Sequence, residues 1–254
     1  MLREGYDKKR IVIIGATSAI AEHCARIWVQ DAAVNVVLVG RDLVKTEQVM
    51  NDLRVRSPKS NIQSMQVDFL SPTKIKSLVD AIFMQDTVDI VLIAHGSLPN
   101  QQQCQENLEL CQEALLVNGV SPALFAEACA IHMQRANAGT LAMIASVAGD
   151  RGRKSNYVYG AAKGLVARYA QGLQHRLAKT AVKVVLIKPG PTDTPMTATL
   201  KQQGARLASV EEVSRRIVRG IQKGQSLVYA PSKWALIMLI IRHLPAFIFN
   251  KMDI

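Results

Sequence analysis

The sequence is poor in the residues that ligate metals and form covalent cross-links. Its four cysteines, Cys24, Cys104, Cys111 and Cys129, form no CxxC pair, and no histidine lies at zinc spacing from them. The five histidines are scattered along the chain. We therefore predict free thiols in a reducing compartment such as the cytoplasm, and no bound metal.

Long apolar runs are also missing. No stretch of the sequence reaches the roughly 20 consecutive apolar residues of a transmembrane helix. The basic segment Lys8-Lys9-Arg10 precedes an apolar run, as in a secretory signal, but the continuous apolar core covers only residues 11–14. A signal peptide needs roughly 7–15 such residues. We interpret this segment as a strand.

Acidic residues are outnumbered, with 31 Lys and Arg against 20 Asp and Glu, which gives a net charge of +11. Such a balance fits an anionic membrane surface, an acidic substrate or nucleic acid. The sequence lacks the interleaved basic and aromatic residues of a nucleic-acid-binding module. We therefore predict no nucleic-acid partner.

The apolar residues that are present recur in short runs rich in Val and Ile, typical of buried strands. These runs cover residues 11–14, 36–39, 90–94, 140–145, 182–187 and 226–229. Helical spacing covers residues 21–30, 44–54, 73–84, 106–116 and 157–178. This alternation predicts an α/β fold, a Rossmann-type doubly wound parallel sheet with helices on both faces. With no repeat and no linker, residues 1–254 form one predicted domain.

The first strand runs into the segment IVIIGATSAIAEHCAR, in which Gly15 is the one glycine. The strict dinucleotide fingerprint has glycines where this chain has Ala19 and Ala21, and each added methyl narrows the space without abolishing it. Amides at the start of the helix would still face an anion. Taken alone, the segment fits a dinucleotide site and a merely tight strand–helix turn equally well.

The second strand, VVLVGRD, ends at Gly40-Arg41, where NAD-specific sites place a carboxylate for the ribose 2′-hydroxyl. A guanidinium there suits a 2′-phosphate, which favours NADP over NAD. The alternative is a solvated arginine at the start of a helix, partly neutralised by Asp42.

A tyrosine and a lysine are spaced one helical turn apart in Tyr159-Gly-Ala-Ala-Lys163. A cation beside a phenol favours the phenolate, so we expect the pKa of Tyr159 to be lowered from about 10, which suits a general acid or base. Tyr157 lacks this spacing. Ser146 ends the strand TLAMIAS, where its hydroxyl could bind a substrate oxygen. A Tyr–Lys pair alone is more often an ordinary helix surface.

Together these residues resemble the short-chain dehydrogenase/reductase family over nearly the whole chain. The resemblance implies a catalytic set of Asn118 (in LLVNGV), Ser146, Tyr159 and Lys163. In this family the asparagine positions a water for proton relay, and the lysine also holds the nicotinamide ribose. The implied cofactor-binding residues are Gly15, Thr17, Ser18, Ala19, Ile20, Arg41, Asp68, Phe69, Ala94, His95, Gly96, Tyr159, Lys163, Pro189, Gly190, Thr192 and Thr194.

Within the implied cofactor site, Asp68 of QVDFL takes the place of the adenine-contacting aspartate. Thr192 and Thr194, after the Pro189-Gly190 motif, take the places that contact the nicotinamide carboxamide. One departure concerns the family's Asn-Asn-Ala-Gly motif, which here reads Ile93-Ala94-His95-Gly96. It keeps the terminal glycine and introduces a histidine near the cofactor.

A narrower resemblance covers GDRGRKSNYVYGAAK and GQSLVYAPSKWALIMLIIRHLPAFIFNKMDI. These stretches are similar to the reductase partner of decaprenylphosphoryl-ribose 2′-epimerase. That resemblance implies a 2-keto pentose carried on a polyprenyl phosphate, and a separate flavin oxidase that makes the ketone.

Basic residues lie between Ser146 and Tyr159, and we expect Arg151, Arg153 and Lys154 to border the pocket and hold a phosphate. A solvated loop is the equal alternative. Residues 195–212 lie where the family carries a substrate lid. Residues 231–254 form an apolar and basic tail that could lie at a membrane interface or pack against a partner subunit.

The sequence therefore predicts an NADP(H)-dependent oxidoreductase that interconverts a carbonyl group and a secondary alcohol. Its preferred substrate is a polyprenyl-phosphate-linked 2-keto sugar, and the alternatives are a soluble ketone or a 3-oxoacyl thioester. A hypothesis of another class is a catalytically silent NADP-binding sensor or scaffold. The family resemblance implies a homodimer or homotetramer, located in the cytoplasm or peripherally at the inner membrane face.

Overall fold

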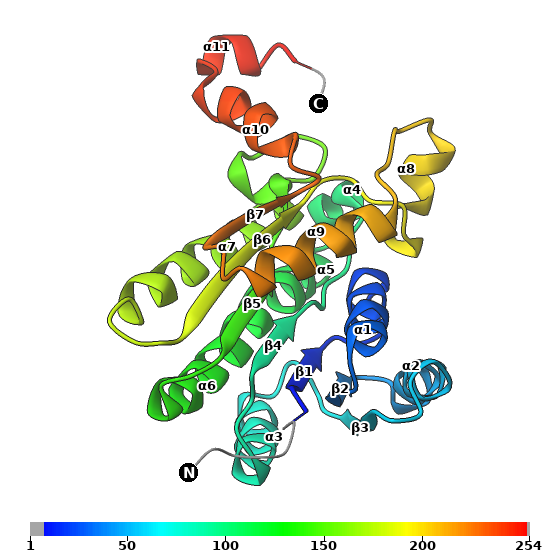
Figure 1. The fold of residues 1–254 in the computed structure, drawn as a ribbon. Coiled ribbons are helices and arrows are strands. Elements are labelled where there is room, and N and C mark those ends of the chain that lie inside the picture. The colour runs from blue at the N-terminus through cyan, green and yellow to red at the C-terminus, as the bar shows by residue number, and fades with distance from the viewer. Residues whose placement is uncertain (1–7, 253–254) are drawn as a thin grey trace.

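A computed structural model describes residues 8–252, and its centre is a parallel sheet of seven strands in the order β3-β2-β1-β4-β5-β6-β7 (Figure 1). All six strand pairings are parallel. This confirms the predicted doubly wound α/β fold. The strands are β1 (Arg10–Ile14), β2 (Asn35–Gly40), β3 (Asn61–Gln66), β4 (Ile90–Ile93), β5 (Thr140–Ile144), β6 (Lys183–Pro189) and β7 (Leu227–Ala230).

The strand β3 is absent from the sequence-based expectations. Its sequence, NIQSMQ, contains no run of Val and Ile, and only Ile62 is fully buried. The reason is its position, because β3 is one of the two edge strands of the sheet and pairs with β2 alone. An edge strand buries less apolar surface than a central one, so its sequence carries a weaker signal.

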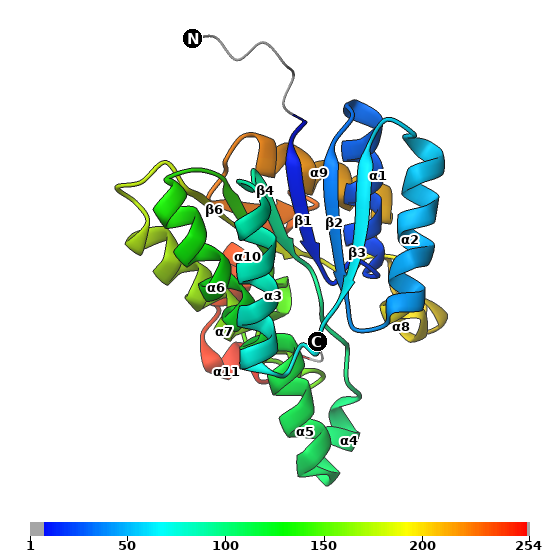
Figure 2. The same ribbon diagram turned by 90° about the horizontal axis from the view of Figure 1, so that it is seen from below.

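Each central strand is buried on both faces, because alternate residues enter different cores. Ile11 and Ile13 pack with α1 (Ala19–Asp31), α2 (Leu43–Arg56) and α9 (Val210–Gln222). Val12 and Ile14 pack with α3 (Pro72–Gln85), α6 (Ser121–Ala136) and α7 (Tyr157–Arg176). Figure 2 shows these two groups of helices on opposite sides of the sheet.

Two of these helices, α6 and α9, were not predicted from the sequence. Helix α6 carries apolar residues around most of its circumference, since it contacts β4, β5, α3 and α7, and so it shows no single apolar stripe. In α9 the signal was present. Val213, Ile217 and Ile221 recur every four residues and are all buried.

The sequence led us to expect no segment that resembles a transmembrane helix, but one helical run does resemble one. It passes through α5 (Leu108–Leu115), η1 (Leu116–Val120) and α6. Leu108–Ala136 is continuous over 29 residues, with a mean hydropathy of 1.6 in its most apolar window, so its length and apolarity match those of a membrane span. However, 61% of that window is buried inside the molecule. The apolarity of this run is that of a core helix.

The short elements of the second half gather at one end of the molecule. The turn η2 (Val147–Asp150) follows β5, and η3 (Pro195–Thr197) with α8 (Ala198–Gln202) follows β6. Helices α10 (Trp234–His243) and α11 (Ala246–Phe249) follow β7. Figure 1 shows α8, α10 and α11 at the carboxyl ends of the strands, the edge at which doubly wound folds bind their ligands.

The expected lid, residues 195–212, comprises η3, α8 and a loop, while its last three residues already belong to α9. The helix α4 (Gln101–Glu106) precedes α5, where the sequence predicted one helix over residues 106–116. Asn107 separates the two, because its side chain accepts a hydrogen bond from the Leu110 amide and so caps α5.

Candidate active site

The turn after β1 requires a glycine at one position only. Gly15 has φ +85°, and a Cβ added there would come within 2.6 Å of His95. Ala21 lies fully buried among the residues that pack α1 on the sheet, so its methyl group fills space that the core supplies. Beside the turn lies a cavity of about 370 Å³ that is lined by Gly15, Thr17, Ser18, Ala19, Ile20, Arg41, Phe69, His95, Gly96 and Thr194, among others. The two alanines therefore leave the cavity open.

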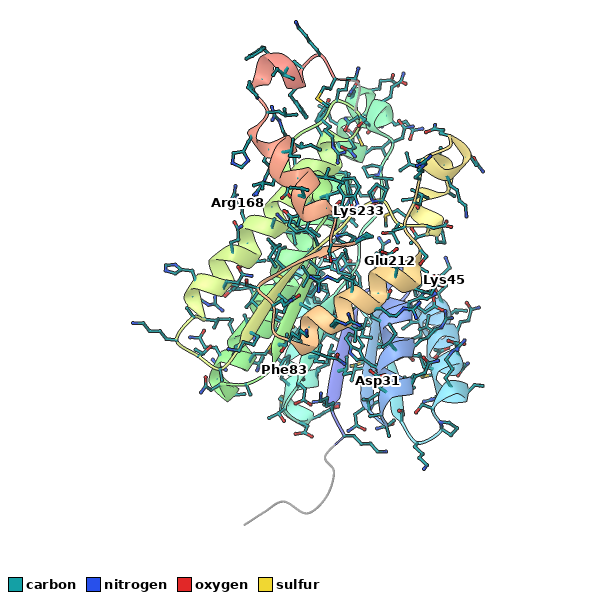
Figure 3. The ribbon with its side chains drawn as sticks, turned by 45° about the horizontal axis from the view of Figure 1, so that its top comes forward. Asp31, Lys45, Phe83, Arg168, Glu212 and Lys233 are labelled. Carbon is teal, nitrogen blue, oxygen red and sulfur yellow. The ribbon has the colours of Figure 1, made fainter. Side chains whose placement is uncertain are left out.

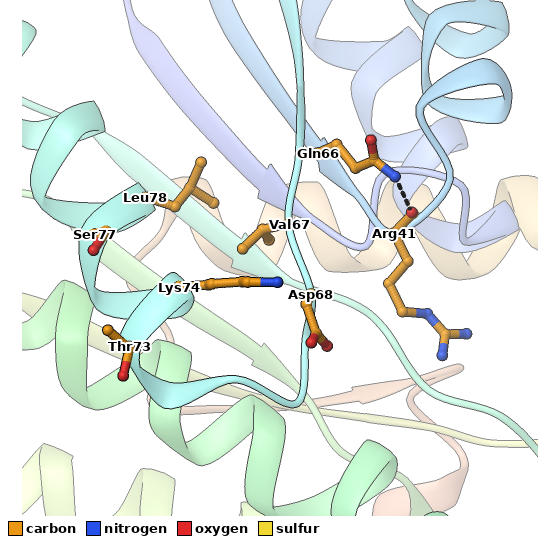
Figure 4. A pocket seen from close by; sticks show the side chains of 8 residues that line it. All are labelled: Arg41, Gln66, Val67, Asp68, Thr73, Lys74, Ser77 and Leu78. Atoms are coloured by element: carbon orange, nitrogen blue, oxygen red, sulfur yellow. Dashed lines mark hydrogen bonds between the residues drawn. The ribbon is translucent and has the colours of Figure 1, made fainter.

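Arg41 lies at the junction of this cavity with a second, shallower one of about 730 Å³. Figure 4 shows its guanidinium and the Asp68 carboxylate extending into the second cavity, with Lys74 reaching toward it from α3. Within residues 8–252, Asp42 forms no ion pair with Arg41; its carboxylate caps α2 at the Lys45 amide and lies 3.7 Å from Lys45 Nζ. Lys74 was not among the predicted site residues, since a helix-surface lysine carries no sequence signal.

A third cavity, of about 350 Å³, brings together Ser146, Tyr159 and Lys163. Its other predicted lining residues are Ala94, His95, Gly96, Pro189, Gly190, Thr192 and Thr194, together with Ser18 and Ile20 from the first cavity. These residues come from the segments after β1, β4 and β5, from the end of β6 and the segment after it, from the first turn of α1 and from α7. Segments far apart in the sequence thus converge where a reacting group would lie.

Tyr159 differs from the expectation in its pKa. Burial raises the pKa of Tyr159 to about 12, and a hydrogen bond with Ser146 only partly opposes this. The expected net lowering by Lys163 does not occur, because the ammonium group, 5.8 Å from the centroid of the Tyr159 ring and donating to Ile144 O at 3.2 Å, does not outweigh the effect of burial. Desolvation of the phenolate therefore dominates, and Tyr159 holds its proton at neutral pH.

Lys163 is only 3% exposed, and burial lowers its pKa to about 8. No carboxylate opposes this shift, since desolvation is its only cause. Tyr157, in contrast, is 44% exposed and lies outside the cavity that holds Ser146. The spacing argument therefore selected the tyrosine that is close to Lys163.

Asn118 lies behind the wall of the cavity, in the π-helical turn η1. Its Oδ1 accepts from the Ser97 amide at 2.8 Å, and its Nδ2 donates to Ala114 O at 2.9 Å. A Cβ added at Gly96 would lie 2.7 Å from Asn118 Oδ1 and 3.3 Å from Lys163 Nζ. Asn118 and Lys163 therefore lie close together at Gly96. Gly96 is the one residue of the family's Asn-Asn-Ala-Gly motif that this chain keeps. π-Helical turns of this kind are frequent at functional sites.

His95 takes the place of the alanine in the family's Asn-Asn-Ala-Gly motif and lies against Gly15, on the wall that the first and third cavities share. Its Nε2 lies 2.9 Å from Ser121 Oγ, and its ring packs on Phe69 with centroids 4.5 Å apart. Burial, followed by the charge of Lys163, lowers the pKa of His95 to about 3, so the ring is neutral. Its Nδ1 is buried and has no hydrogen-bond partner among residues 8–252.

Of the three basic residues expected to border the substrate pocket, only Arg153 lines the third cavity. Arg153 lines the cavity, and its buried Nε has no partner in the described part of the chain. Arg151 is directed away from it, since its Nη1 donates to Ile241 O and Leu244 O at 2.6 Å, and its guanidinium lies 3.8 Å from the centroid of the Phe249 ring. Lys154 is also not among the lining residues. Sequence reasoning could not anticipate these contacts of Arg151, because the carbonyls that it binds lie about 90 residues further along the chain.

Residues 195–212, the segment expected to form a lid, contribute lining residues that sequence reasoning missed. Met196, Leu200 and Arg206 line the third cavity, together with Leu98 from the loop after β4. No sequence motif marks them, because their place at the cavity depends on how the chain folds back after β6. In the described part of the chain, no group of three or more His, Cys, Asp and Glu side chains is arranged to hold a metal.

The model of the short chain dehydrogenase family matches residues 9–205 of this chain. The chain therefore belongs to the short-chain dehydrogenase/reductase family, and it is an oxidoreductase of that family. It is 27% identical, over 246 residues and 96% of both chains, to an uncharacterized oxidoreductase in the mprA 5′ region of Streptomyces coelicolor. It is also 30% identical to an uncharacterized oxidoreductase of Staphylococcus epidermidis, over 75% of this chain and 80% of that one.

Solved structures share the fold at lower identity. A short-chain dehydrogenase from Sphingobium yanoikuyae in complex with NADPH has a TM-score of 0.80 and 20% identity, covering 94% of this chain and 97% of that one. One from Burkholderia cenocepacia in complex with NADP has a TM-score of 0.82 and 15% identity over 98% of both chains. A bulky-bulky ketone specific alcohol dehydrogenase from Comamonas testosteroni has a TM-score of 0.79 and 20% identity, over 97% and 96%.

Proposed function

We propose that this oxidoreductase is an NADP(H)-dependent ketoreductase that interconverts a carbonyl group and a secondary alcohol. The observation that carries the proposal is the convergence of Ser146, Tyr159 and Lys163 on one cavity, which also includes Pro189 and Gly190. A bound nicotinamide would supply or accept the hydride. The protein's own groups bind and orient the carbonyl and move the proton.

Tyr159 is the group that donates the proton to the carbonyl oxygen, because its high pKa keeps it protonated at neutral pH. Ser146, which shares a hydrogen bond with Tyr159, orients the same oxygen. Below about pH 8 the charge of Lys163 stabilises the phenolate that remains after the transfer. Asn118, held against Gly96 beside Lys163, is the proposed site of the water that returns the proton.

The residues around the first cavity fit a dinucleotide, and we propose NADP(H) over NAD. Arg41 borders two cavities and Asp42 is engaged by Lys45, so the guanidinium is available to a 2′-phosphate. Asp68 and Lys74 border the space beyond Arg41, where the adenine would lie. The buried Nδ1 of His95 calls for a hydrogen-bond partner, which a cofactor hydroxyl or amide would supply. The NADPH complex of the Sphingobium relative supports the same assignment.

The third cavity supports a bulky substrate with an anionic group. Arg153 and Arg206 offer cationic groups, while Leu98, Val147 and Leu200 form apolar walls. A polyprenyl-phosphate-linked 2-keto sugar has both features, and a separate flavin oxidase would then supply the ketone. A soluble bulky ketone, of the kind named for the Comamonas relative, and a 3-oxoacyl thioester are the alternatives. Residues 195–212 would close over the substrate as a lid.

Two further predictions concern assembly and location. Helices α5 and α7 expose large apolar side chains, namely Leu108, Leu110, Leu115, Tyr157 and Leu165, which supports a homodimer or homotetramer through these helices. A cytoplasmic location, with peripheral contact at the inner membrane face, also stays a prediction.

Cofactor binding is tested by titrating NADPH and NADH separately while following nicotinamide fluorescence. NADPH should bind more tightly, and Arg41→Ala should weaken NADPH about tenfold or more and leave NADH unchanged, because one charge-assisted contact is lost. Arg168→Ala is the matched control, since Arg168 lies exposed on α7 (Figure 3). Equal binding of both cofactors by the wild type would refute the NADP preference.

Turnover is tested with a panel of ketones and phosphate-bearing keto sugars. Tyr159→Phe should lower kcat by about 10² or more, and Tyr157→Phe should leave it unchanged. Arg153→Ala should raise KM for anionic ketones more than for neutral ones. Tight NADPH binding without reduction of any carbonyl compound would instead favour the silent sensor or scaffold.

A further inference from the structure

The two C-terminal helices α10 and α11 present apolar side chains on both their inner and their outer faces. Met238, with Trp234, Ile237 and Ile241, faces inward and packs with Val147 and Tyr229. Leu236, Leu239 and Ile240 point outward and are 64%, 48% and 56% exposed. A helix that is apolar on all sides is normally buried on all sides. The outer face of α10 therefore lacks a covering layer within the described chain.

The exposed apolar surface continues beyond α10. Phe247 and Ile248 of α11 are 70% and 41% exposed, and Met252 is 37% exposed. The apolar helix α10 is only ten residues long, too short to cross a bilayer. Such a segment suits binding in the plane of an interface instead.

The charged residues of α10, α11 and their flanks, residues 231–252, are all basic. No aspartate or glutamate occurs between Glu212 and Asp253 in the sequence, whereas Lys233, Arg242 and Lys251 flank or interrupt the two helices. Figure 3 shows Lys233 at the base of α10. A protein partner with an apolar groove would not require this bias. An anionic lipid surface would, because it attracts each basic residue near its plane.

Helices α10 and α11 pack directly against residues at or next to the candidate active site. The Trp234 indole lies so close to Gly190 that a Cβ there would be 1.9 Å from its Nε1. Arg151, five residues after Ser146, holds the carbonyls of Ile241 and Leu244 and the ring of Phe249. Whatever binds the outer face of α10 therefore binds next to the walls of the catalytic cavity.

We propose that Leu236, Leu239, Ile240, Phe247 and Ile248, flanked by Lys233, Arg242 and Lys251, form a docking surface for an anionic membrane. The proposal does not depend on the substrate or on turnover. The apolar side chains enter the boundary between headgroups and acyl chains, and the basic side chains contact anionic headgroups. The cavity with Ser146 then lies close to the lipid surface.

Co-sedimentation of the full chain with vesicles tests this surface. The wild type should bind vesicles of phosphatidylcholine with phosphatidylglycerol, bind phosphatidylcholine alone far more weakly, and lose binding as salt rises. Leu239→Glu combined with Phe247→Glu should lower the bound fraction about tenfold or more. The control is Val55→Glu with Met84→Glu, since these side chains on α2 and α3 are 82% and 84% exposed.

Three results would overturn the proposal. The first is a wild type that stays in the supernatant with both kinds of vesicle. The second is an equal loss of binding in the control variant, which would make the interaction non-specific. The third is a drop in oligomeric mass of the Leu239→Glu, Phe247→Glu variant on size exclusion without any vesicle binding by the wild type, which would assign the surface to a second copy. Thermal unfolding of each variant verifies that it folds.

Discussion

The buried Lys163 and His95 and the partly exposed Tyr159 lie together at the carboxyl edge of the sheet, and desolvation shifts their pKa values in opposite directions. It raises the pKa of the tyrosine to about 12 and lowers the pKa values of the lysine and histidine to about 8 and about 3. In each case burial penalises the charged form. At neutral pH the site therefore contains a protonated phenol, a neutral imidazole and an ammonium group that is close to losing its proton.

This arrangement predicts a pH dependence for carbonyl reduction. Lys163 carries its charge below its pKa of about 8, so kcat/KM should be constant there and fall as the pH rises through about 8. The physical reason is that neutral Lys163 no longer stabilises the phenolate that Tyr159 becomes. A pH profile of NADPH oxidation with one ketone measures this, and Lys163→Met should lack the limb. A profile that stays flat beyond pH 9 would contradict the assignment.

At the scale of elements, the turn η2 is anchored to the strands β6 and β7 through the side chain of Asp150. Asp150 forms an ion pair with Lys188 of β6 and accepts a hydrogen bond from the Tyr229 hydroxyl of β7 at 2.8 Å. The charged side chains of the pair are only 4% and 5% exposed. Lys188 immediately precedes Pro189-Gly190, so this pair ties the turn that carries Ser146 to the segment where the nicotinamide would lie.

Removing one partner of that pair should be costly. Asp150→Asn leaves the Lys188 ammonium buried without a counter-charge, and we expect about 3–5 kcal/mol of lost stability. Asp193→Asn is the matched control, because its pair with Lys201 at 2.6 Å is exposed and should contribute about 0–1 kcal/mol. Denaturant titration of both variants measures the difference. Similar losses in the two would show that burial of the Asp150 pair is unimportant.

At the scale of the whole molecule, Arg151 connects the catalytic turn to the end of the chain. It reaches from η2 to both C-terminal helices, a separation of 90 and 93 residues to the carbonyls that it binds. The cluster around Met238 supplies the apolar part of the same contact. The tail is therefore a structural part of the domain, although the sequence describes it only as an apolar and basic segment.

Arg151→Ala should loosen the tail without unfolding the domain. Two carbonyls lose their donor and Phe249 loses its cationic partner, so amide exchange in residues 234–249 should accelerate about tenfold or more. Hydrogen–deuterium exchange measures this, with Arg56→Ala as a control whose partner Asp52 is on α2. Unchanged exchange in the tail, or acceleration throughout the domain, would contradict this role for Arg151.

The sequence by itself determined the parallel sheet, the order of the site segments and the choice of Tyr159 over Tyr157. These depend on short-range features: runs of Val and Ile, a one-turn spacing and motifs at the ends of strands. The tertiary structure decided the pKa of Tyr159, the π-helical setting of Asn118, the burial of the His95 Nδ1 and the attachment of Arg151 to the tail. Each of these depends on burial or on contacts with distant residues, and local spacing contains no information about either.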